Sequence, residues 1–324
     1  MRAQIMKKKI LVSVMGMALA MSVSNGMAGS KIDGKVSNTS TVKKAINMAI
    51  GDQNKARMGS ISMKGTQIGK TGVVTNNSKV EKAINMAIGK GNTANMGSIN
   101  MANTKIDGRV SNKSTVKKAI NMAIGQNNTA NMGTINIKGG SVGKTGVVSN
   151  DSKVEKAINM AIGKGNTANM GTINMQNAKV NGRISNKSTV KKAINMAIGQ
   201  NNTANMGTIN MKGGSIGKTG VVTNDSKVEK AINMAIGKGN TANMGTVNLQ
   251  NSKIAGKVSN TSTVKKAINM AIGQNNTANM GTISIKNSTI GKTGVVSNDS
   301  KVEKAINMAI GKGNEASMGS VSVE

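Results

Sequence analysis

Residues 78–101 read SKVEKAINMAIGKGNTANMGSINM, and versions of this stretch recur along the chain. Its segment AINMAIG begins at eight alanines, spaced alternately 38 and 36 residues apart: Ala45, Ala83, Ala119, Ala157, Ala193, Ala231, Ala267 and Ala305. The chain therefore contains four copies of a 74-residue pair. Self-similarity at such a period is typical of a solenoid, in which each unit buries its apolar face only by stacking on its neighbours.

The chain divides into a leader and one repeat array. Residues 1–28 have a basic start, an apolar run over residues 10–23 and a small-residue end, which predicts a secretory signal peptide cleaved after Ala28. A membrane anchor is the weaker interpretation, because this run is shorter than the ~20 residues of a spanning helix. We expect a secreted protein, extracellular or on the cell surface, whose array fills residues 29–324. Its units start near residues 32, 68, 106, 142, 180, 216, 254 and 290.

The composition argues against an enzyme. There is no Cys, His, Pro, Phe, Tyr or Trp, and the 12 Asp and Glu residues are scattered without a close pair for acid–base chemistry. We therefore expect no catalytic residue, no cofactor and no metal. The formal charge is +32, of which the leader contributes four, and this excess should attract anionic partners such as extracellular DNA, lipopolysaccharide or acidic polysaccharide.

Periodicity alone does not decide the conformation of residues 78–89. A helix would place Val80, Ala83, Ile84, Ala87 and Ile88 on one face, with a capping-box spacing at its start and a glycine at its end. A strand would instead separate the Ile and Met side chains from the Ala and Asn side chains, with period two.

The rest of the unit favours strands. IDGKVSN at residues 32–38 and the two-residue-longer IGKTGVVTN at residues 68–76 are short, alternating and rich in Gly and Asn. After each of these segments we expect a Ser/Thr-rich turn, followed by AINMAIG and a Gly/Asn turn. Each unit then ends in a strand-like run, such as residues 96–101. Stacked strands lie ~4.8 Å apart, whereas a helix in every unit would force strong curvature. We predict an all-β, amyloid-like β-solenoid of eight stacked windings.

One column of charged residues alternates in sign from unit to unit. Stacked units would bring each charge opposite its counter-charge, and such contacts are worth about 0.2–1 kcal/mol each, enough to set the register. The predicted inter-winding charge ladder is Lys43, Glu81, Lys117, Glu155, Lys191, Glu229, Lys265 and Glu303.

The next position is lysine in every unit, and such a column is tolerable only where it faces water. It would present a stripe of positive charge to polyanions. The residues are Lys44, Lys82, Lys118, Lys156, Lys192, Lys230, Lys266 and Lys304.

A further column consists of asparagines, each three residues after the glycine of AINMAIG. Stacked Asn side chains can form amide ladders along a cross-β axis, although Asn is also favoured for its turn conformation, and the two roles are compatible. The residues are Asn54, Asn92, Asn128, Asn166, Asn202, Asn240, Asn276 and Asn314, and Asn47 and Asn85 form another potential ladder.

A column of methionines has two interpretations. Thioethers can bind Cu(I), but a methionine at a repeated core position is more often a packing residue, which is the interpretation we favour. The column is Met58, Met96, Met132, Met170, Met206, Met244, Met280 and Met318.

Residues 77–100 resemble the two-fold repeat of the fungal HET-s prion-forming domain. The matching features are Ser78, Val80 and Glu81, the turn at residues 88–91, and the Lys/Glu alternation between paired units. Residues 89–94 also resemble the G-x-G-N-x-A core of curli fibre subunits. These resemblances imply a self-assembling, amyloid-like β-solenoid.

Two hypotheses about function follow. The first is a structural role, in which secreted chains self-assemble into extracellular cross-β fibres (functional amyloid) for the cell surface, adhesion or a biofilm matrix. The second is a soluble basic solenoid that binds polyanions such as DNA or acidic glycans. In neither hypothesis does the chain span a membrane.

Overall fold

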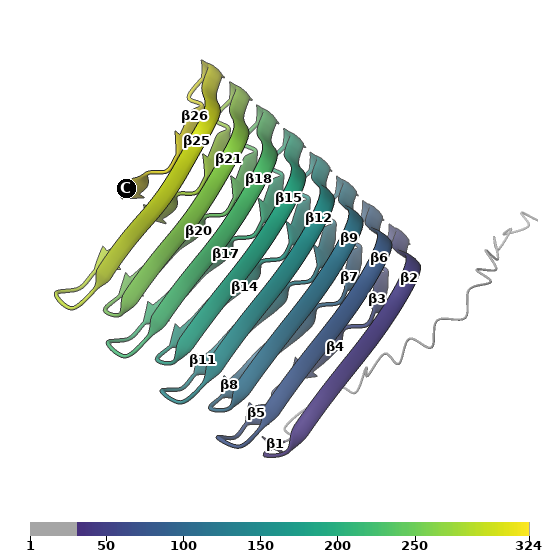
Figure 1. The fold of residues 1–324 in the computed structure, drawn as a ribbon, viewed down its shortest axis with the longest axis vertical. Coiled ribbons are helices and arrows are strands. Elements are labelled where there is room, and N and C mark those ends of the chain that lie inside the picture. Colours follow the sequence, from purple (N-terminus) through teal and green to yellow (C-terminus); the bar gives the residue numbers. More distant parts are fainter. Residues whose placement is uncertain (1–30, 324) are drawn as a thin grey trace, which may run out of the picture.

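The computed structural model describes residues 31–323, and the predicted signal peptide lies outside them. The described chain is an all-β solenoid of eight windings stacked in parallel (Figure 1), which confirms the predicted fold class. We number the windings 1 to 8 in chain order. Among the described residues there is no helix of the length and hydropathy that crossing a membrane requires.

The front of the stack in Figure 1 is a sheet of eight parallel 18-residue strands in chain order. Residues at the same repeat position pair with one another, as Ala83 does with Ala119. The helical alternative for residues 78–89 is therefore wrong. The strands are β2 (Lys35–Asp52), β6 (Val73–Lys90), β9 (Arg109–Gln126), β12 (Val147–Lys164), β15 (Arg183–Gln200), β18 (Val221–Lys238), β21 (Lys257–Gln274) and β25 (Val295–Lys312).

The Ser/Thr-rich turn expected before AINMAIG is wrong as well, because each long strand runs through that segment without interruption. Ser78 faces the interior, and Thr is a good strand former. The change of direction lies further on. Glu81 and Lys82 are both exposed between the buried Val80 and Ala83, so the inward–outward alternation shifts there, as it does at a β-bulge.

A second sheet follows the long strands, with one four-residue strand per winding, again paired in parallel. Its strands are β3 (Lys55–Met58), β7 (Thr93–Met96), β10 (Thr129–Met132), β13 (Thr167–Met170), β16 (Thr203–Met206), β19 (Thr241–Met244), β22 (Thr277–Met280) and β26 (Glu315–Met318).

The third sheet lies behind the first half of the long strands and has eleven strands. They are β1 (Lys31–Ile32), β4 (Ile61–Lys64), β5 (Gln67–Ile68), β8 (Ile99–Ile106), β11 (Ile135–Val142), β14 (Ile173–Val180), β17 (Ile209–Ile216), β20 (Val247–Ile254), β23 (Ile283–Lys286), β24 (Thr289–Ile290) and β27 (Val321–Val323).

The apolar run expected at residues 96–101 is split between the second and third sheets at Gly97 and Ser98. Gly97 has a φ of +58°, and a Cβ there would lie 2.5 Å from the Oγ of Ser78. The glycine therefore makes the corner, because other residues would be strained in this conformation and would collide with the long strand.

Two apolar cores run the length of the stack. The larger one lies between the third sheet and the first half of the long strands and includes Ile68, Val74 and Ile99. The smaller one lies at the bend and includes Val80 and the methionine column. Six of the eight column methionines are buried, which supports packing rather than copper binding: Met96, Met132, Met170, Met206, Met244 and Met280.

The arcs that join the third sheet to the next long strand alternate in length. In winding 1 the arc consists of residues 33–34, and in winding 2 it consists of residues 69–72. The longer arc is held on the shorter one before it, since Thr71 Oγ1 donates to the carbonyl of Asp33 at 2.8 Å. The same bond joins Thr145 to the carbonyl of Asp107 at 2.9 Å. The 74-residue pair is thus also a structural pair.

Candidate functional site

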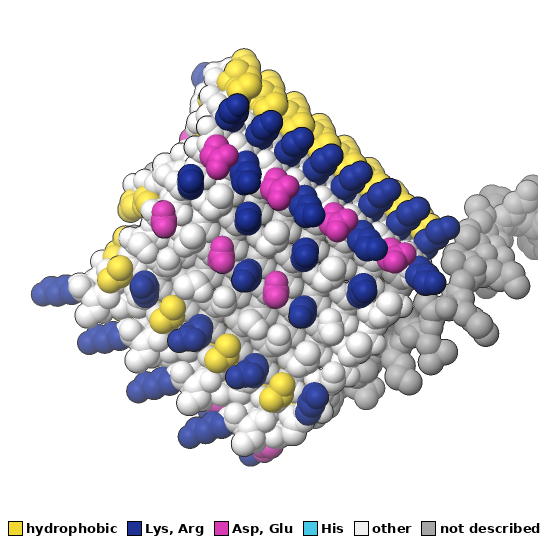
Figure 2. All heavy atoms as spheres, in the orientation of Figure 1, with side chains coloured by type: hydrophobic (Ala, Val, Ile, Leu, Met, Phe, Trp, Pro, Cys, Tyr) yellow, Lys and Arg dark blue, Asp and Glu magenta, His cyan; other side chains and the backbone are white. Residues whose placement is uncertain are grey.

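The charge-ladder residues lie at the bend of the long strands, and they form the row of alternating sign in Figure 2. Lys117 Nζ lies 3.7 Å from Glu81 Oε1 in the preceding winding, and the two side chains are 55% and 47% exposed. Exposed pairs contribute at most about 1 kcal/mol each. The row therefore favours one order of windings over others and adds little to overall stability.

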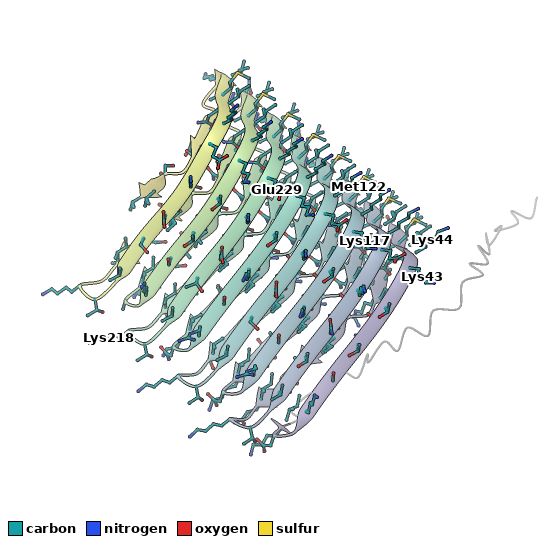
Figure 3. All side chains as sticks on the ribbon, viewed as in Figure 1. Lys43, Lys44, Lys117, Met122, Lys218 and Glu229 are labelled. Atoms are coloured by element: carbon teal, nitrogen blue, oxygen red, sulfur yellow. The ribbon has the colours of Figure 1, made fainter. Side chains whose placement is uncertain are left out.

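The lysine column lies directly beside that row, and its members are exposed in all eight windings. Lys82 pairs with Lys118, and Lys156 with Lys192, so identical charges stand one strand spacing apart along the stack. Figure 3 shows Lys43 and Lys44 close together near one edge of the stack. The column itself holds no acidic side chain, and the glutamates nearest to it are those of the charge ladder.

The asparagines of the column from Asn54 to Asn314 hydrogen bond within the turn after each long strand. The backbone N–H of Asn92 donates to Asn128 Oδ1 in the next winding at 2.8 Å. Asn92 Nδ2 donates back to the carbonyl of Ile88 at 2.5 Å and to the carbonyl of Gly51 in the preceding winding. The left-handed residue of these turns is the one before the asparagine, such as Gly91 or Asn127. The column therefore stabilises the turn and links the windings.

The ladder at Asn47 and Asn85 is present, and it continues through all eight windings. Asn85 Nδ2 donates to Asn121 Oδ1 in the next winding at 2.8 Å. It also lies 3.1 Å from the carbonyl of Ala94 and 2.9 Å from that of Asn131, so it ties the long strand to the second sheet. Every bond between neighbouring amides runs toward the C-terminal end. The column thus offers an acceptor at Asn47 and a donor at Asn307.

Sequence reasoning missed two kinds of feature, of which further asparagine ladders are the first. One begins at Asn38, whose Nδ2 donates to Asn76 Oδ1 at 2.8 Å. In two others the bonds run the opposite way, from Asn131 to Asn95 and from Asn136 to Asn100, both at 2.8 Å. The recurrence of Asn at the 36- and 38-residue spacing was the signal that could have found them.

The second missed feature is an apolar stripe on the outside of the stack. In AINMAI the Ala and Asn side chains face the interior, and the two Ile and the Met face outward. The stripe consists of Ile46, Met48, Ile50, Ile84, Met86, Ile88, Ile120, Met122, Ile124, Ile158, Met160, Ile162, Ile194, Met196, Ile198, Ile232, Met234, Ile236, Ile268, Met270, Ile272, Ile306, Met308 and Ile310. Figure 2 shows it as a hydrophobic row next to the lysine column.

The two end windings differ from the interior ones in exposure. Ile46 and Ile50 of winding 1 are 54% and 57% exposed, and Ile306 and Ile310 of winding 8 are 51% and 49% exposed. Their counterparts in windings 2 to 7 are only partly exposed, because a neighbouring winding covers each side. Within residues 31–323, no further strand covers the outer edges of β2 and β25. Such edges are templates for pairing with another chain.

The described residues contain no group of three or more Asp or Glu side chains placed to hold a metal ion. The fold and the stacking columns define a β-solenoid repeat protein with asparagine ladders. No protein-family model matches the chain, and a search of curated proteins gives no match.

Proposed function

We propose that this chain is a secreted structural protein whose copies join end to end into extracellular cross-β fibres. The single observation that carries the proposal is the pair of open end windings. The outer edge of β25 offers backbone groups that no strand pairs with within residues 31–323, together with partly covered apolar side chains. The outer edge of β2 offers the equivalent groups at the same repeat positions. Pairing the two would extend the same three parallel sheets from one copy into the next.

The columns specify the polarity of that contact. Winding 1 carries Lys43 and winding 8 carries Glu303, so head-to-tail joining continues the alternation of charge. Head-to-head or tail-to-tail joining would turn one stack over, so that β2 or β25 would meet its own copy antiparallel and the parallel columns would not continue across the contact. The Asn307 amide would also reach an Asn47 acceptor only in the head-to-tail arrangement. The resemblance to HET-s and curli repeats supports the same kind of assembly.

The proposal is tested by incubating the chain from Gly29 onward and examining it by electron microscopy and fibre diffraction. We expect unbranched fibres with a meridional reflection near ~4.8 Å, the spacing of stacked strands. Chains that stay monomeric by light scattering after long incubation, with no such reflection, would refute it. N-terminal sequencing of exported protein tests the leader, and we expect the mature chain to begin at Gly29.

A second candidate function is polyanion binding by the lysine column, favoured by eight stacked, exposed lysines without an acidic neighbour in the column. Binding of DNA or an acidic glycan should weaken steeply with added NaCl, because each lysine–phosphate contact releases counterions. Affinity that does not change with salt would rule this function out. This role is compatible with fibre formation.

A further inference from the structure

The outward apolar stripe is continuous from the first winding to the last. It is three side chains wide and eight windings long. With strand spacings of ~4.8 Å and rises of ~3.3 Å per residue, it measures about 13 by 34 Å, or about 440 Å². This is within the size range of the largest apolar patch on a typical monomer, which is often functional. The assembly proposed above leaves the stripe uncovered, because end-to-end joining lengthens it.

Positive charge lines the stripe on both sides. One side is the lysine column, and the residues Lys82, Ala83 and Ile84 of winding 2, with their counterparts in windings 3 to 8, line one continuous groove. On the other side, exposed lysines alternate with glutamines in windings 2 to 8: Lys90, Gln126, Lys164, Gln200, Lys238, Gln274 and Lys312. Asp52 is the exception in winding 1.

A second copy of the chain is a poor occupant for this face. For two single chains, two stripes placed together would bury about 900 Å² in total, which is below the ~1,000 Å² expected of a specific interface. The contact would also bring the lysine-rich rims of the two copies together, where Asp52 is the only acidic residue, and like charges at an interface oppose association.

We propose that the stripe docks on the surface of an anionic lipid bilayer. The Ile and Met side chains would enter the boundary between head groups and acyl chains, and the flanking lysines would meet the lipid phosphates. An apolar face with cationic rims is the arrangement by which amphipathic segments bind such surfaces, through buried apolar area together with attraction to anionic lipids. The docking does not require end-to-end assembly.

The test is co-flotation with vesicles of phosphatidylcholine and phosphatidylglycerol (3:1) and with vesicles of phosphatidylcholine alone. The chain is used in full and from Gly29 onward, so that the apolar leader cannot account for binding. We expect at least tenfold stronger partition onto the anionic vesicles for both forms. Equal partition onto the two kinds of vesicle would overturn the proposal.

The apolar contribution is tested with four Ile→Thr substitutions in windings 2, 4, 6 and 8, at Ile84, Ile158, Ile232 and Ile306. The matched control places four Val→Thr substitutions in the same windings, on outward side chains away from the stripe: Val73, Val147, Val221 and Val295. We expect the stripe variant to lose at least tenfold in partition and the control to stay within twofold. Equal effects of the two sets would contradict docking through the stripe.

The charge contribution has its own matched pair, because both variants remove four positive charges. Lys→Gln at Lys82, Lys156, Lys230 and Lys304 should reduce binding to that of neutral vesicles. Lys→Gln at the exposed Lys79, Lys153, Lys227 and Lys301, on the other side of the bend, should reduce it by less than threefold. Equal losses would mean that net charge alone is responsible, and would overturn the assignment to this face.

If a variant with four substitutions fails to fold, a single labelled side chain provides a separate test of docking. An environment-sensitive fluorophore on Met122→Cys should shift to the blue with anionic vesicles, and the same label on Val147→Cys should not. No shift at either position would refute docking. Lateral pairing of two stacks through the labelled stripe, detected by cross-linking without lipid, would replace the bilayer with a second copy and refute it as well.

Discussion

The side-chain amide of Asn159 hydrogen bonds to Oδ1 of Asn195 in the next winding at 2.8 Å, and both residues are fully buried. The same nitrogen lies 2.9 Å from the carbonyls of Ala168 and Asn205, which belong to the second sheet. One amide therefore joins two sheets and two windings. Because the contact repeats along the stack, its disruption in one winding tests the role of the whole column.

Asn159→Asp should destabilise the solenoid by about 3 kcal/mol or more, because it buries a carboxylate against carbonyl oxygens and removes the donor. Urea denaturation followed by circular dichroism measures the change. The matched control is Asn77→Asp, at an exposed site where windings 4, 6 and 8 already carry Asp151, Asp225 and Asp299. The control should stay within about 0.5 kcal/mol. Similar losses for the two variants would contradict a special role for the buried ladder.

Gly163→Ala should destabilise by more than about 1 kcal/mol, because alanine is strained at positive φ. Gly163 has a φ of +116°, and a Cβ there would lie 2.2 Å from the carbonyl oxygen of Gly125 in the preceding winding. Gly34→Ala is the control, since a Cβ at that position meets nothing within 4 Å. Thermal unfolding of the two variants gives the comparison, and an unchanged melting temperature for Gly163→Ala would show that the turn relaxes.

Glu155→Lys should cost about 0.8–4 kcal/mol, because at each of its two ladder neighbours, Lys117 and Lys191, it would remove an attraction and add a repulsion, each worth about 0.2–1 kcal/mol. Glu155→Gln should cost less, since it removes attraction without adding repulsion. The difference between the variants, measured by urea denaturation, should shrink with added NaCl, which screens exposed charges. A difference that does not depend on salt would argue against charge as its cause.

Glu303→Lys should slow fibre elongation, because the new positive charge would stand against Lys43 of the next copy in the head-to-tail contact. Seeded growth followed by light scattering measures the rate, and added NaCl should restore much of it. Glu155→Lys makes the same change in net charge inside the stack and should leave the rate nearly unchanged. Equal slowing by both variants would show that overall charge, not the end contact, controls growth.

Stability should rise steeply with the number of stacked pairs. A chain with one 74-residue pair should be largely unfolded, and chains with two, three and four pairs should unfold at increasing urea concentrations, since each added winding contributes an interface. Circular dichroism of the four chains provides the measurement. A fully folded single pair would show that the stack does not depend on its neighbours.

The repeat and the class of fold could be predicted from the sequence, because stacked windings impose one residue per column at a constant interval. The charge and asparagine columns followed from the same rule. The sequence did not predict which face of AINMAI points outward, since both faces are uncharged and Ile and Met are ordinarily core residues. Ala83, Asn85 and Ala87 are buried instead, and the Asn85 amide reaches the carbonyl of Ala94 in the second sheet at 3.1 Å, so the larger side chains face outward.

The position of the bend in the long strands was also not predicted from the sequence. Ser and Thr suggested a turn before AINMAIG, whereas the change of direction occurs at the charged pair Glu81 and Lys82. Two neighbouring charged side chains between two apolar ones were the available signal, because neither charge can enter the core and the alternation must therefore shift by one residue. The position of the bend depends on how the strand packs against the rest of the winding, and local residue propensities do not encode that packing.

The alternation of short and long arcs constrains how the gene for such a protein can change in length. Loss or duplication of a single winding would place two equal arcs and two like charges on adjacent levels, and the Thr71 hydroxyl or one of its equivalents would lose its acceptor. Removal or gain of a whole 74-residue pair preserves every contact between neighbouring windings. Unequal recombination should therefore favour alleles that differ in steps of two windings over those with an odd number of windings.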